Sequence, residues 1–450
     1  MLKLGSSGET GQTGLRSKRL RALTIPNFRI YFSGLLVSVS GTWMQATAQA
    51  WLVLQLTNSP LALATVASLQ FLPIMLLSLI GGALADRFPR RKLMFITQAL
   101  AAAQAILLGA LVVTHAVTIW HIYGLAVTLG LINALDAPLR QAFVSELVTI
   151  ETLPNAIALT ALVQNLGRIV GPAIGGIALA SLGVGAAFFL NAATFSGTLI
   201  ALLLIDGRKL VSAKIAPRGG VLDQVGESLA YAWKRPTILF LLIGTSFIGV
   251  FGQNFTTMVP LVSNYLVKAG PAQFGLLNSC LGTGSFLSAI ALTSRGIPSV
   301  NRILVAGTAF GLALIAISLS SNLLVSCGLF VIVGAAAVTF SASVNTSLQI
   351  QSPPDMRGRF AAMINLLIVG SSPIGAMMTG AIAASAGVWL SIFINGLLCC
   401  LGMGLAYAYL VRVRSAGARF DLGEQPAQLR VVPTPVAKPS FEAEPEIGVS

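Results

Sequence analysis

The segment Gly82–Lys92, GALADRFPRRK, separates two long stretches of the chain that contain no charged residue, 30–85 and 93–135. Asp86 ends the first stretch, and four basic residues follow it within six positions: Arg87, Arg90, Arg91 and Lys92. A membrane-spanning helix needs roughly 20 apolar residues. The segment therefore predicts a short charged connection between spanning helices, where charge pairs can form and break as the helices tilt.

The composition agrees with this interpretation. Of 450 residues, 55% are hydrophobic and 9% are charged, whereas an ordinary soluble domain carries about 25% charged residues. We therefore expect an all-α integral membrane protein. The net charge of +14 could suggest a nucleic-acid partner, but the basic residues lie in the connections between apolar stretches, so we expect none.

Five more stretches lack charged residues: 169–205, 236–267, 269–294, 303–354 and 360–411. Each of the five longest of the seven stretches touches two predicted helices, which are joined by an uncharged turn. The other two stretches contain one predicted helix each. This predicts twelve spans, near Ile30–Leu54, Leu61–Ala85, Leu93–Thr114, Trp120–Leu139, Leu153–Leu182, Ala186–Ile205, Leu239–Tyr265, Gln273–Thr293, Ile303–Ser318, Leu323–Ile350, Arg359–Ala384 and Trp389–Val411.

The distribution of basic residues predicts the orientation. They precede the first span and lie on every second connection, whereas the opposite connections hold one, Lys268. By the positive-inside rule both termini are cytoplasmic. The expected parts are a cytoplasmic amino-terminal tail (1–26), a six-helix bundle (27–206), a cytoplasmic linker (207–237), a second six-helix bundle (238–412) and a disordered cytoplasmic tail (413–450).

Two features of the chain concern its halves. In the linker, four apolar residues recur at every fourth position and predict an amphipathic helix at the membrane surface: Val221, Val225, Leu229 and Trp233. In the spans, Ile169–Gly175 (IVGPAIG) recurs loosely as Ile368–Gly375 (IVGSSPIG). Two halves related by duplication are typical of transporters with parallel repeats.

The spacing Gly82-x3-Asp86-Arg87-x-Pro89-x-Arg91-Lys92 resembles the signature between the second and third helices of major facilitator superfamily transporters, with Pro89 in place of the usual glycine. The resemblance implies two six-helix bundles and a cytoplasmic gate in which Asp86 contacts the start of the eleventh helix. The implied gating residues are Gly82, Asp86, Arg87, Arg91, Lys92, Asp355, Arg357 and Arg359. The alternative is a charge pattern that only sets topology.

The fifth span carries Gly167-Arg168-x2-Gly171-Pro172-x2-Gly175-Gly176, which resembles the Gly-Pro motif of efflux members except that Ala158 replaces its first glycine. The resemblance implies tight packing that limits proton leak. The same residues could equally form a face for close helix packing, because small residues let backbones approach and proline bends a helix.

Charged residues inside the spans are candidates for proton coupling. Arg168 is a cation deep in a span and should face a cavity or a partner, because an unpaired charge in the bilayer is costly. Asp136 lies one helical turn from Arg140, so we expect a local ion pair. The sharper alternative is an Asp136 that switches between Arg140 and Arg168 as protons bind.

Neutral polar residues in the first and seventh spans are candidates for a substrate cavity, because in the family the first, fourth, seventh and tenth helices line it. These candidates are Gln45, Gln49, Gln253 and Asn254. Such side chains would suit an amphipathic, largely uncharged substrate. Hydrogen bonds between helices are the alternative role for each of them.

No Gly-Lys dipeptide and no HExxH motif occur, so we expect no ATP-binding loop, no cofactor, no metal site and no enzymatic activity. Three segments resemble the superfamily branch of enterobactin exporters and macrolide efflux proteins: Trp51-Leu52-Val53, Asp136-Ala137-Pro138-x-Arg140-Gln141 and Arg168-x2-Gly171-Pro172. The resemblance implies a monomer in the inner membrane that exports a drug, macrolide or siderophore in exchange for protons by alternating access. A facilitator or importer on the same fold, and a receptor that transports nothing, remain alternatives.

Overall fold

The computed structural model describes residues 21–210, 231–233, 235–353 and 356–415, and only the backbone of 78–87, 358, 361–362 and 414–415. The linker positions Val221, Val225 and Leu229, the gating candidate Asp355 and residues 416–450 lie outside this description. All regular elements of the described residues are helical, which confirms the all-α class. The described elements up to Leu410 belong to one compact unit.

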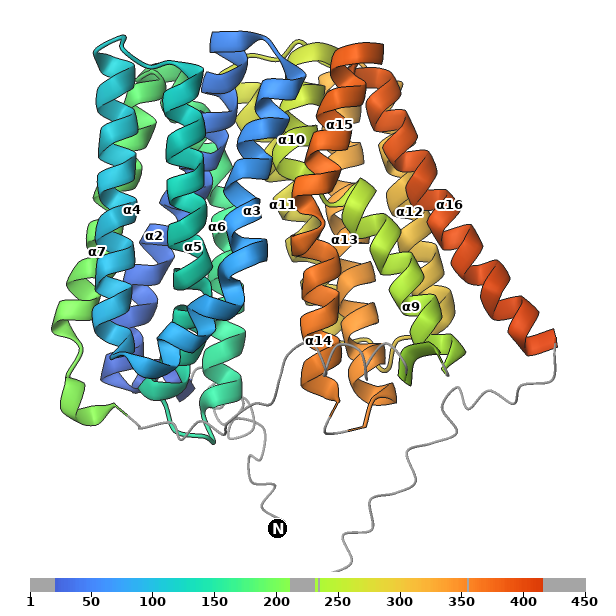
Figure 1. The fold of residues 1–450 in the computed structure, drawn as a ribbon, viewed down its shortest axis with the longest axis horizontal. Helices are drawn as coiled ribbons and strands as arrows, with labels where there is room; N and C mark the ends of the chain where they lie inside the picture. Colours follow the sequence, from blue (N-terminus) through green and yellow to red (C-terminus); the bar gives the residue numbers. More distant parts are fainter. Residues whose placement is uncertain (1–20, 211–230, 234, 354–355, 416–450) are drawn as a thin grey trace, which may run out of the picture. The chain divides into compact units, whose positions relative to one another are not determined.

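The first half of the chain contains six long helices, blue to green in Figure 1. They are α2 (Pro26–Thr57), α3 (Pro60–Arg87), α4 (Arg90–Val113), α5 (Ile119–Leu147), α6 (Leu153–Ser181) and α7 (Val184–Leu204). Short 3-10 turns flank them, η1 (Arg21–Thr24) and η2 (Gly207–Lys209). Each helix contains the core of one predicted span.

The second half begins with a helix that is interrupted twice. Its parts are α9 (Pro236–Phe247), the π-helical turn η3 (Ile248–Gly252), α10 (Phe255–Leu261) and a second π-helical turn, η4 (Val262–Leu266). The axis bends by 43° at the break. The span predicted near Leu239–Tyr265 is therefore bent and interrupted in this structure. π-Helical turns are rare and occur frequently at functional sites.

The remaining helices complete the second half, yellow to red in Figure 1. They are α11 (Pro271–Thr293), α12 (Val300–Ser318), α13 (Leu323–Gln351), α14 (Arg357–Asn365), the π-helical turn η5 (Leu366–Gly370), α15 (Ser372–Ala386) and α16 (Val388–Ser415). The predicted eleventh span is interrupted by η5, whereas the others agree with prediction to within a few residues.

Turn chemistry explains the ends of these helices. Asn58 and His115 adopt left-handed conformations in the turns after α2 and α4, and Gly183 and Gly387 have positive φ in the turns after α6 and α15, which glycine tolerates without strain. Asn322 caps α13 by accepting hydrogen bonds from the amides of Leu324 and Val325. The sequence therefore specifies the hairpins locally.

Ten helices of the described residues are long and apolar enough to cross a membrane, and the bent pair α9–α10 makes an eleventh candidate. The helix predicted as the first span, α2, is 32 residues long but is not among them, because glutamine, serine and threonine side chains dilute its apolar character. The count of twelve spans thus stays a prediction.

The packing of α6 has a counterpart in the second half. α6 packs on α2 of its own half and on α11 of the other half. α15 packs on η3 of its own half and on α3 of the other half. The fifth helix of each half therefore contacts the first helix of its own half and the second helix of the other, as duplicated halves require.

The halves are joined near the end of the molecule that carries the α2–α3 turn. Tyr265 donates a hydrogen bond to the carbonyl oxygen of Asn58 at 2.6 Å, and Ser68 donates to that of Pro373 at 2.9 Å. Figure 1 shows α3 beside α15 at this end. Ring stacking of Trp51 on Phe274, with centroids 5.8 Å apart, adds to the contact.

Candidate functional site

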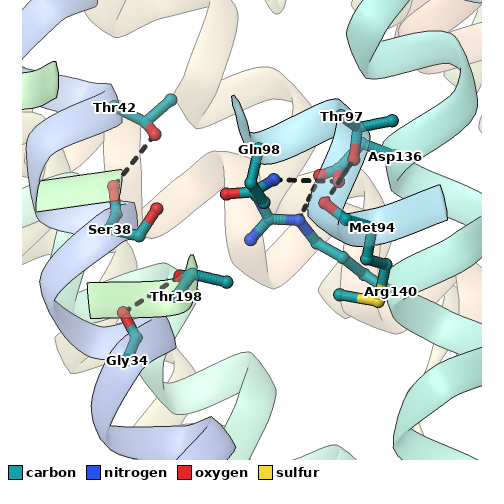
Figure 2. A network of polar contacts seen from close by, with 9 residues as sticks. All are labelled: Gly34, Ser38, Thr42, Met94, Thr97, Gln98, Asp136, Arg140 and Thr198. Carbon is teal, nitrogen blue, oxygen red and sulfur yellow. Dashed lines mark hydrogen bonds and ion pairs between the residues drawn. The ribbon is translucent and has the colours of Figure 1, made fainter. Parts of the chain in front are cut away.

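Asp136 is the centre of a buried polar network in the first half (Figure 2). One carboxylate oxygen accepts hydrogen bonds from Thr97 Oγ1 at 2.7 Å and Gln98 Nε2 at 2.9 Å, both on α4. The other oxygen pairs with Nε of Arg140, one turn along α5. Asp136 is 3% exposed, so this arrangement holds a buried carboxylate with three donors. The predicted local pair of Asp136 and Arg140 is present.

Polar atoms without partners lie between this network and α2. The side-chain oxygens of Gln98, Ser38 and Tyr31 are buried and have no hydrogen-bond partner among the described residues. In Figure 2 the amide oxygen of Gln98 points toward α2, where Ser38 lies. Buried polar groups are normally satisfied, by ordered water where protein groups are absent. These atoms therefore mark a place where water or a polar ligand group can bind.

Arg168 of α6 lies with its guanidinium carbon 5.0 Å from the centre of the Trp43 ring on α2. Such a cation–π contact stabilises a cation at a desolvated site. Because a charge inside a membrane span is costly without a partner, the Trp43 ring meets the expectation that Arg168 has one. The alternative in which Asp136 moves between Arg140 and Arg168 stays a prediction.

Gln45 takes part in a second buried network. It donates to Gln104 of α4 at 3.0 Å and accepts from Asn191 of α7 at 2.6 Å. Asn191 also accepts from Thr194 at 3.0 Å. These contacts give Gln45 the interhelical role that the sequence left as an alternative. A cavity role for Gln45 stays a prediction.

The other three cavity candidates have different surroundings. Gln253 follows the π-helical turn η3 and donates to Ser341 of α13 at 3.0 Å. Asn254, at the break between η3 and α10, donates to the carbonyl oxygen of Val250 at 2.6 Å, but its own side-chain oxygen is buried with no partner in the described part of the chain. The amide nitrogen of Gln49 is likewise buried and unpartnered among the described residues.

The basic residues of the opening segment make contacts within the first half. Arg91 donates to the carbonyl oxygens of Leu202 at 2.6 Å and Leu203 at 3.0 Å, at the carboxyl end of α7. A cation there stabilises the helix dipole and its free carbonyls. Arg90 pairs with Glu146 of α5 at 2.8 Å, whereas Lys92 is exposed.

Most of the remaining gating candidates cannot be placed in full. Gly82, Asp86 and Arg87 lie at the end of α3, where only the backbone is described. Arg357 is exposed at the start of α14 and donates to the carbonyl oxygen of Ser352 at 3.4 Å, and Arg359 is half-buried two residues further along. The gate stays a prediction.

The glycines of α6 face two neighbouring helices. A Cβ on Gly167, Gly171 or Gly175 would meet α2, and a Cβ on Gly176 would meet α11 at Gly275. Ser279 of α11 donates to the carbonyl oxygen of Ile169 at 2.9 Å, close to Pro172 in the same helix. The motif therefore forms a close packing face on both sides, and its predicted meaning for efflux stays open.

Five residues of the two networks were not predicted: Thr97, Gln98, Gln104, Asn191 and Thr194. All lie in charge-free stretches, where an isolated polar residue looks like an ordinary part of an apolar helix. Gln104 follows Thr97 by seven residues, about two helical turns, so these two side chains lie on one face of α4. That spacing was the signal that could have identified Thr97 and Gln104.

Comparison with known proteins gives the family. The family described as transmembrane secretion effector, a branch of the major facilitator superfamily, matches residues 18–435. The chain belongs to this family. It is a multi-pass membrane transporter and not an enzyme.

Two relatives and one solved structure illustrate the likeness. The multidrug efflux pump Tap of Mycolicibacterium fortuitum is 27% identical over 411 residues, 89% of this chain and 98% of that protein. The enterobactin exporter EntS of Citrobacter koseri is 26% identical over 369 residues, 80% and 86% of the two chains. A bacterial homologue of the human lysosomal transporter Spinster, crystallised inward-facing and unoccupied, has a TM-score of 0.64 at 15% identity over 90% of this chain and 99% of that one. This last likeness shows the major facilitator fold.

Proposed function

We propose that this transporter exports an amphipathic, largely uncharged small molecule in exchange for protons and that Asp136 binds the proton. The observation that carries the proposal is the buried Asp136 with its three donors and the unpartnered oxygens of Gln98 and Ser38 beside it. Drug and siderophore export by the relatives Tap and EntS supports the same direction of transport.

Protonation of Asp136 changes the network in a defined way. The ionised carboxylate accepts from Thr97 and Gln98 and neutralises Arg140. A proton on it removes the charge, so Arg140 loses its partner and must move toward water or another acceptor, because an unpaired buried cation is costly. The unpartnered oxygens of Gln98 and Ser38 are acceptors for water, and water bound there would give the proton a route from the side of α2.

The expected substrate follows from the polar groups near the helix break. In the described spans, Asp136 and Glu146 are each paired with an arginine. At this break the described residues with an unpartnered buried side-chain atom include Asn254 and Thr257, both neutral, and Gln49 of α2 has another. Neutral donors and acceptors among apolar side chains bind the uncharged polar groups of an amphipathic molecule.

Alternating access supplies the movement. With both termini in the cytoplasm of a plasma-membrane protein, the α2–α3 turn is extracytoplasmic, and the halves meet there in this structure. Export requires these contacts to separate while the cytoplasmic ends close. We propose that Asp86 and the start of α14 form the closed cytoplasmic contact, and that the monomer is the transporting unit.

The test uses inverted membrane vesicles from cells that overproduce the chain. Respiration acidifies their interior, so a proton-coupled exporter accumulates a probe inside. Three probes cover the expected substrates: ethidium, erythromycin and enterobactin. Uptake of at least one of them that collapses when the pH gradient is dissipated supports the proposal, and gradient-independent equilibration would instead identify a facilitator.

A further inference from the structure

A cavity of about 540 Å³ lies between α4 and α5. Its walls are almost wholly apolar and are formed by Leu93, Ile96, Thr97, Leu100, Ala103, Gln104 and Leu107 of α4 and by Leu125, Thr128, Leu131, Ile132, Leu135 and Leu139 of α5. The volume falls in the ~300–1,000 Å³ range of small-molecule sites. We call this cavity the α4–α5 groove.

The groove opens on the membrane side of the two helices. Ile96, Leu100 and Leu107 of its α4 wall are 53%, 52% and 51% exposed, and Leu131 of its α5 wall is 42% exposed. Large apolar side chains that are exposed in the middle of spanning helices face the acyl chains of the bilayer. The groove is therefore filled from the lipid phase.

The floor of the groove is closed toward the interior of the half. Thr97 is bonded to Asp136, and Gln104 is bonded to Gln45 and, at 3.5 Å, to the carbonyl oxygen of Leu125. The polar groups of the floor are thus engaged inside the protein. What the groove offers its occupant is an apolar surface, not a set of free hydrogen-bond donors.

The Leu93 end of the groove is followed by charged residues. Beyond Leu93 and Leu139 along the chain, Arg90 of α4 and Glu146 of α5 form an ion pair. Lys92 is exposed one helical turn before Ile96, so it lies at the outer rim of the same end. The occupant has a cation beside one end and apolar walls along the rest.

We propose that the α4–α5 groove binds one acyl chain of an anionic phospholipid, with the head-group phosphate at Lys92. From Leu93 to Leu107 the groove runs roughly 21 Å at ~1.5 Å per residue, enough for a chain that crosses one leaflet, ~15 Å of a ~30 Å hydrocarbon core. A basic residue at the membrane surface attracts anionic lipid. The assignment holds whichever way the protein is oriented and does not depend on the proposed export.

The experiment measures lipid binding to the purified full-length chain in detergent by native mass spectrometry. Phosphatidylglycerol and phosphatidylcholine of identical acyl chains are compared, and a phosphatidylglycerol with a diazirine on one chain locates the site by cross-linking. We expect one tightly retained phosphatidylglycerol, preferred over phosphatidylcholine, and cross-links in α4 and α5 between Leu100 and Leu107 and between Leu125 and Ile132.

Variants separate the acyl chain from the head group. Ala103→Trp and Thr128→Trp, both at exposed positions, fill the groove from opposite walls and should each reduce retention at least tenfold. Ile106→Trp, exposed on α4 outside the groove, should stay within twofold of wild type. Lys92→Gln should reduce the preference for phosphatidylglycerol about fivefold, whereas Arg295→Gln, an exposed arginine of the other half, should not.

Three results would overturn the proposal. Equal retention in wild type and both tryptophan variants, with unchanged cross-links, would show that lipid does not occupy the groove. Equal affinity of wild type for the two phospholipids would remove the head-group assignment. Displacement of the cross-linkable lipid by erythromycin or ethidium would make the groove a site for transported molecules rather than for lipid.

Discussion

Asp136 is held by one residue of its own helix and two of the neighbouring helix. Arg140 lies one turn along α5, whereas Thr97 and Gln98 reach it from α4. Two consecutive side chains of one helix that contact the same carboxylate fix the rotation of α4 against α5. The protonation state of Asp136 is therefore coupled to how these two helices pack.

Asp136→Asn should abolish uptake of the probe driven by a pH gradient, because the amide cannot take up the proton. The same change leaves the half-buried Arg140 without its counter-charge, which is unfavourable, so the midpoint of thermal unfolding in detergent should fall. Uptake in inverted vesicles and the unfolding midpoint are measured on the same preparation.

The double variant Asp136→Asn/Arg140→Gln separates coupling from folding. It removes both charges, so it should recover much of the lost stability but no gradient-driven uptake. Glu146→Gln is the matched control, because it breaks the second acid–arginine pair of α5 and should lower stability while pH-dependent uptake persists. Gradient-driven uptake in the double variant would show that the proton binds elsewhere.

Asp86→Asn tests the predicted gate. It should leave the protein inserted, because the basic residues that set topology remain, but should reduce transport at least tenfold by weakening the closed cytoplasmic contact. Surface expression and transport rate are compared with those of wild type and of Asp86→Glu, which keeps the carboxylate. Wild-type rates in Asp86→Asn would leave the segment with a topological role alone.

How much of the site could be predicted differs from residue to residue. Asp136 and Arg140 are charged residues four apart in an apolar stretch, so the sequence predicted the pair that the structure contains; its role in proton coupling stays a prediction. Thr97 and Gln98 are common residues whose role depends on which face of α4 meets α5, and no local pattern states that. Arg90 and Arg91 were predicted as a cationic cluster, but their separate partners on α5 and α7 depend on tertiary packing.

At the scale of the element, α6 depends on its glycines. Gly171→Leu should destabilise the protein, because a Cβ there would overlap Trp43 and the backbone of Ser40, and such overpacking costs about 1–3 kcal/mol. Gly124→Leu is the matched control: it lies in α5 with open space around it, and leucine favours a helix over glycine by up to about 1 kcal/mol. The unfolding midpoint should fall for the first variant and stay or rise for the second.

An unchanged midpoint for Gly171→Leu would mean that α2 and α6 can separate without loss, and the close packing of the motif would then be unimportant for stability. Transport of the two variants adds a second readout. If the packing face also limits proton leak, vesicles with Gly171→Leu should lose their pH gradient faster than wild type before the probe is added.

The helices themselves were predictable because charge-free stretches, glycine and asparagine turns and first-turn prolines all mark their limits. The interruptions were not. The break after η3 follows Gly249 and Gly252, and a Cβ on Gly249 would overlap the backbone of Leu367 in η5. The π-helical turns η3 and η5 thus lie against each other, in a contact between the seventh and eleventh spans that neither stretch reveals alone.

At the scale of the whole molecule, the two halves are joined by helix packing and a few neutral hydrogen bonds. They consist of small-residue packing between α6 and α11, contact of α3 with α15, and a few hydrogen bonds to backbone oxygens, such as those of Tyr265 and Ser68. Interfaces of this kind can separate without unfolding either half. The contact of η3 with η5 lies within the second half, so it can persist while the halves move.

The most direct test of alternating access links the two halves covalently at the end of the molecule that carries the α2–α3 turn. Thr65 of α3 and Met377 of α15 are in contact, with Oγ1 and Sδ 3.9 Å apart. Both are therefore replaced by cysteine. The background is a chain whose four native cysteines are replaced by alanine. Oxidation to the disulfide should stop probe uptake in inverted vesicles, and reduction should restore it, while either single variant is unaffected. Full transport by the oxidised double variant would contradict the account, because the substrate would then cross without the halves separating.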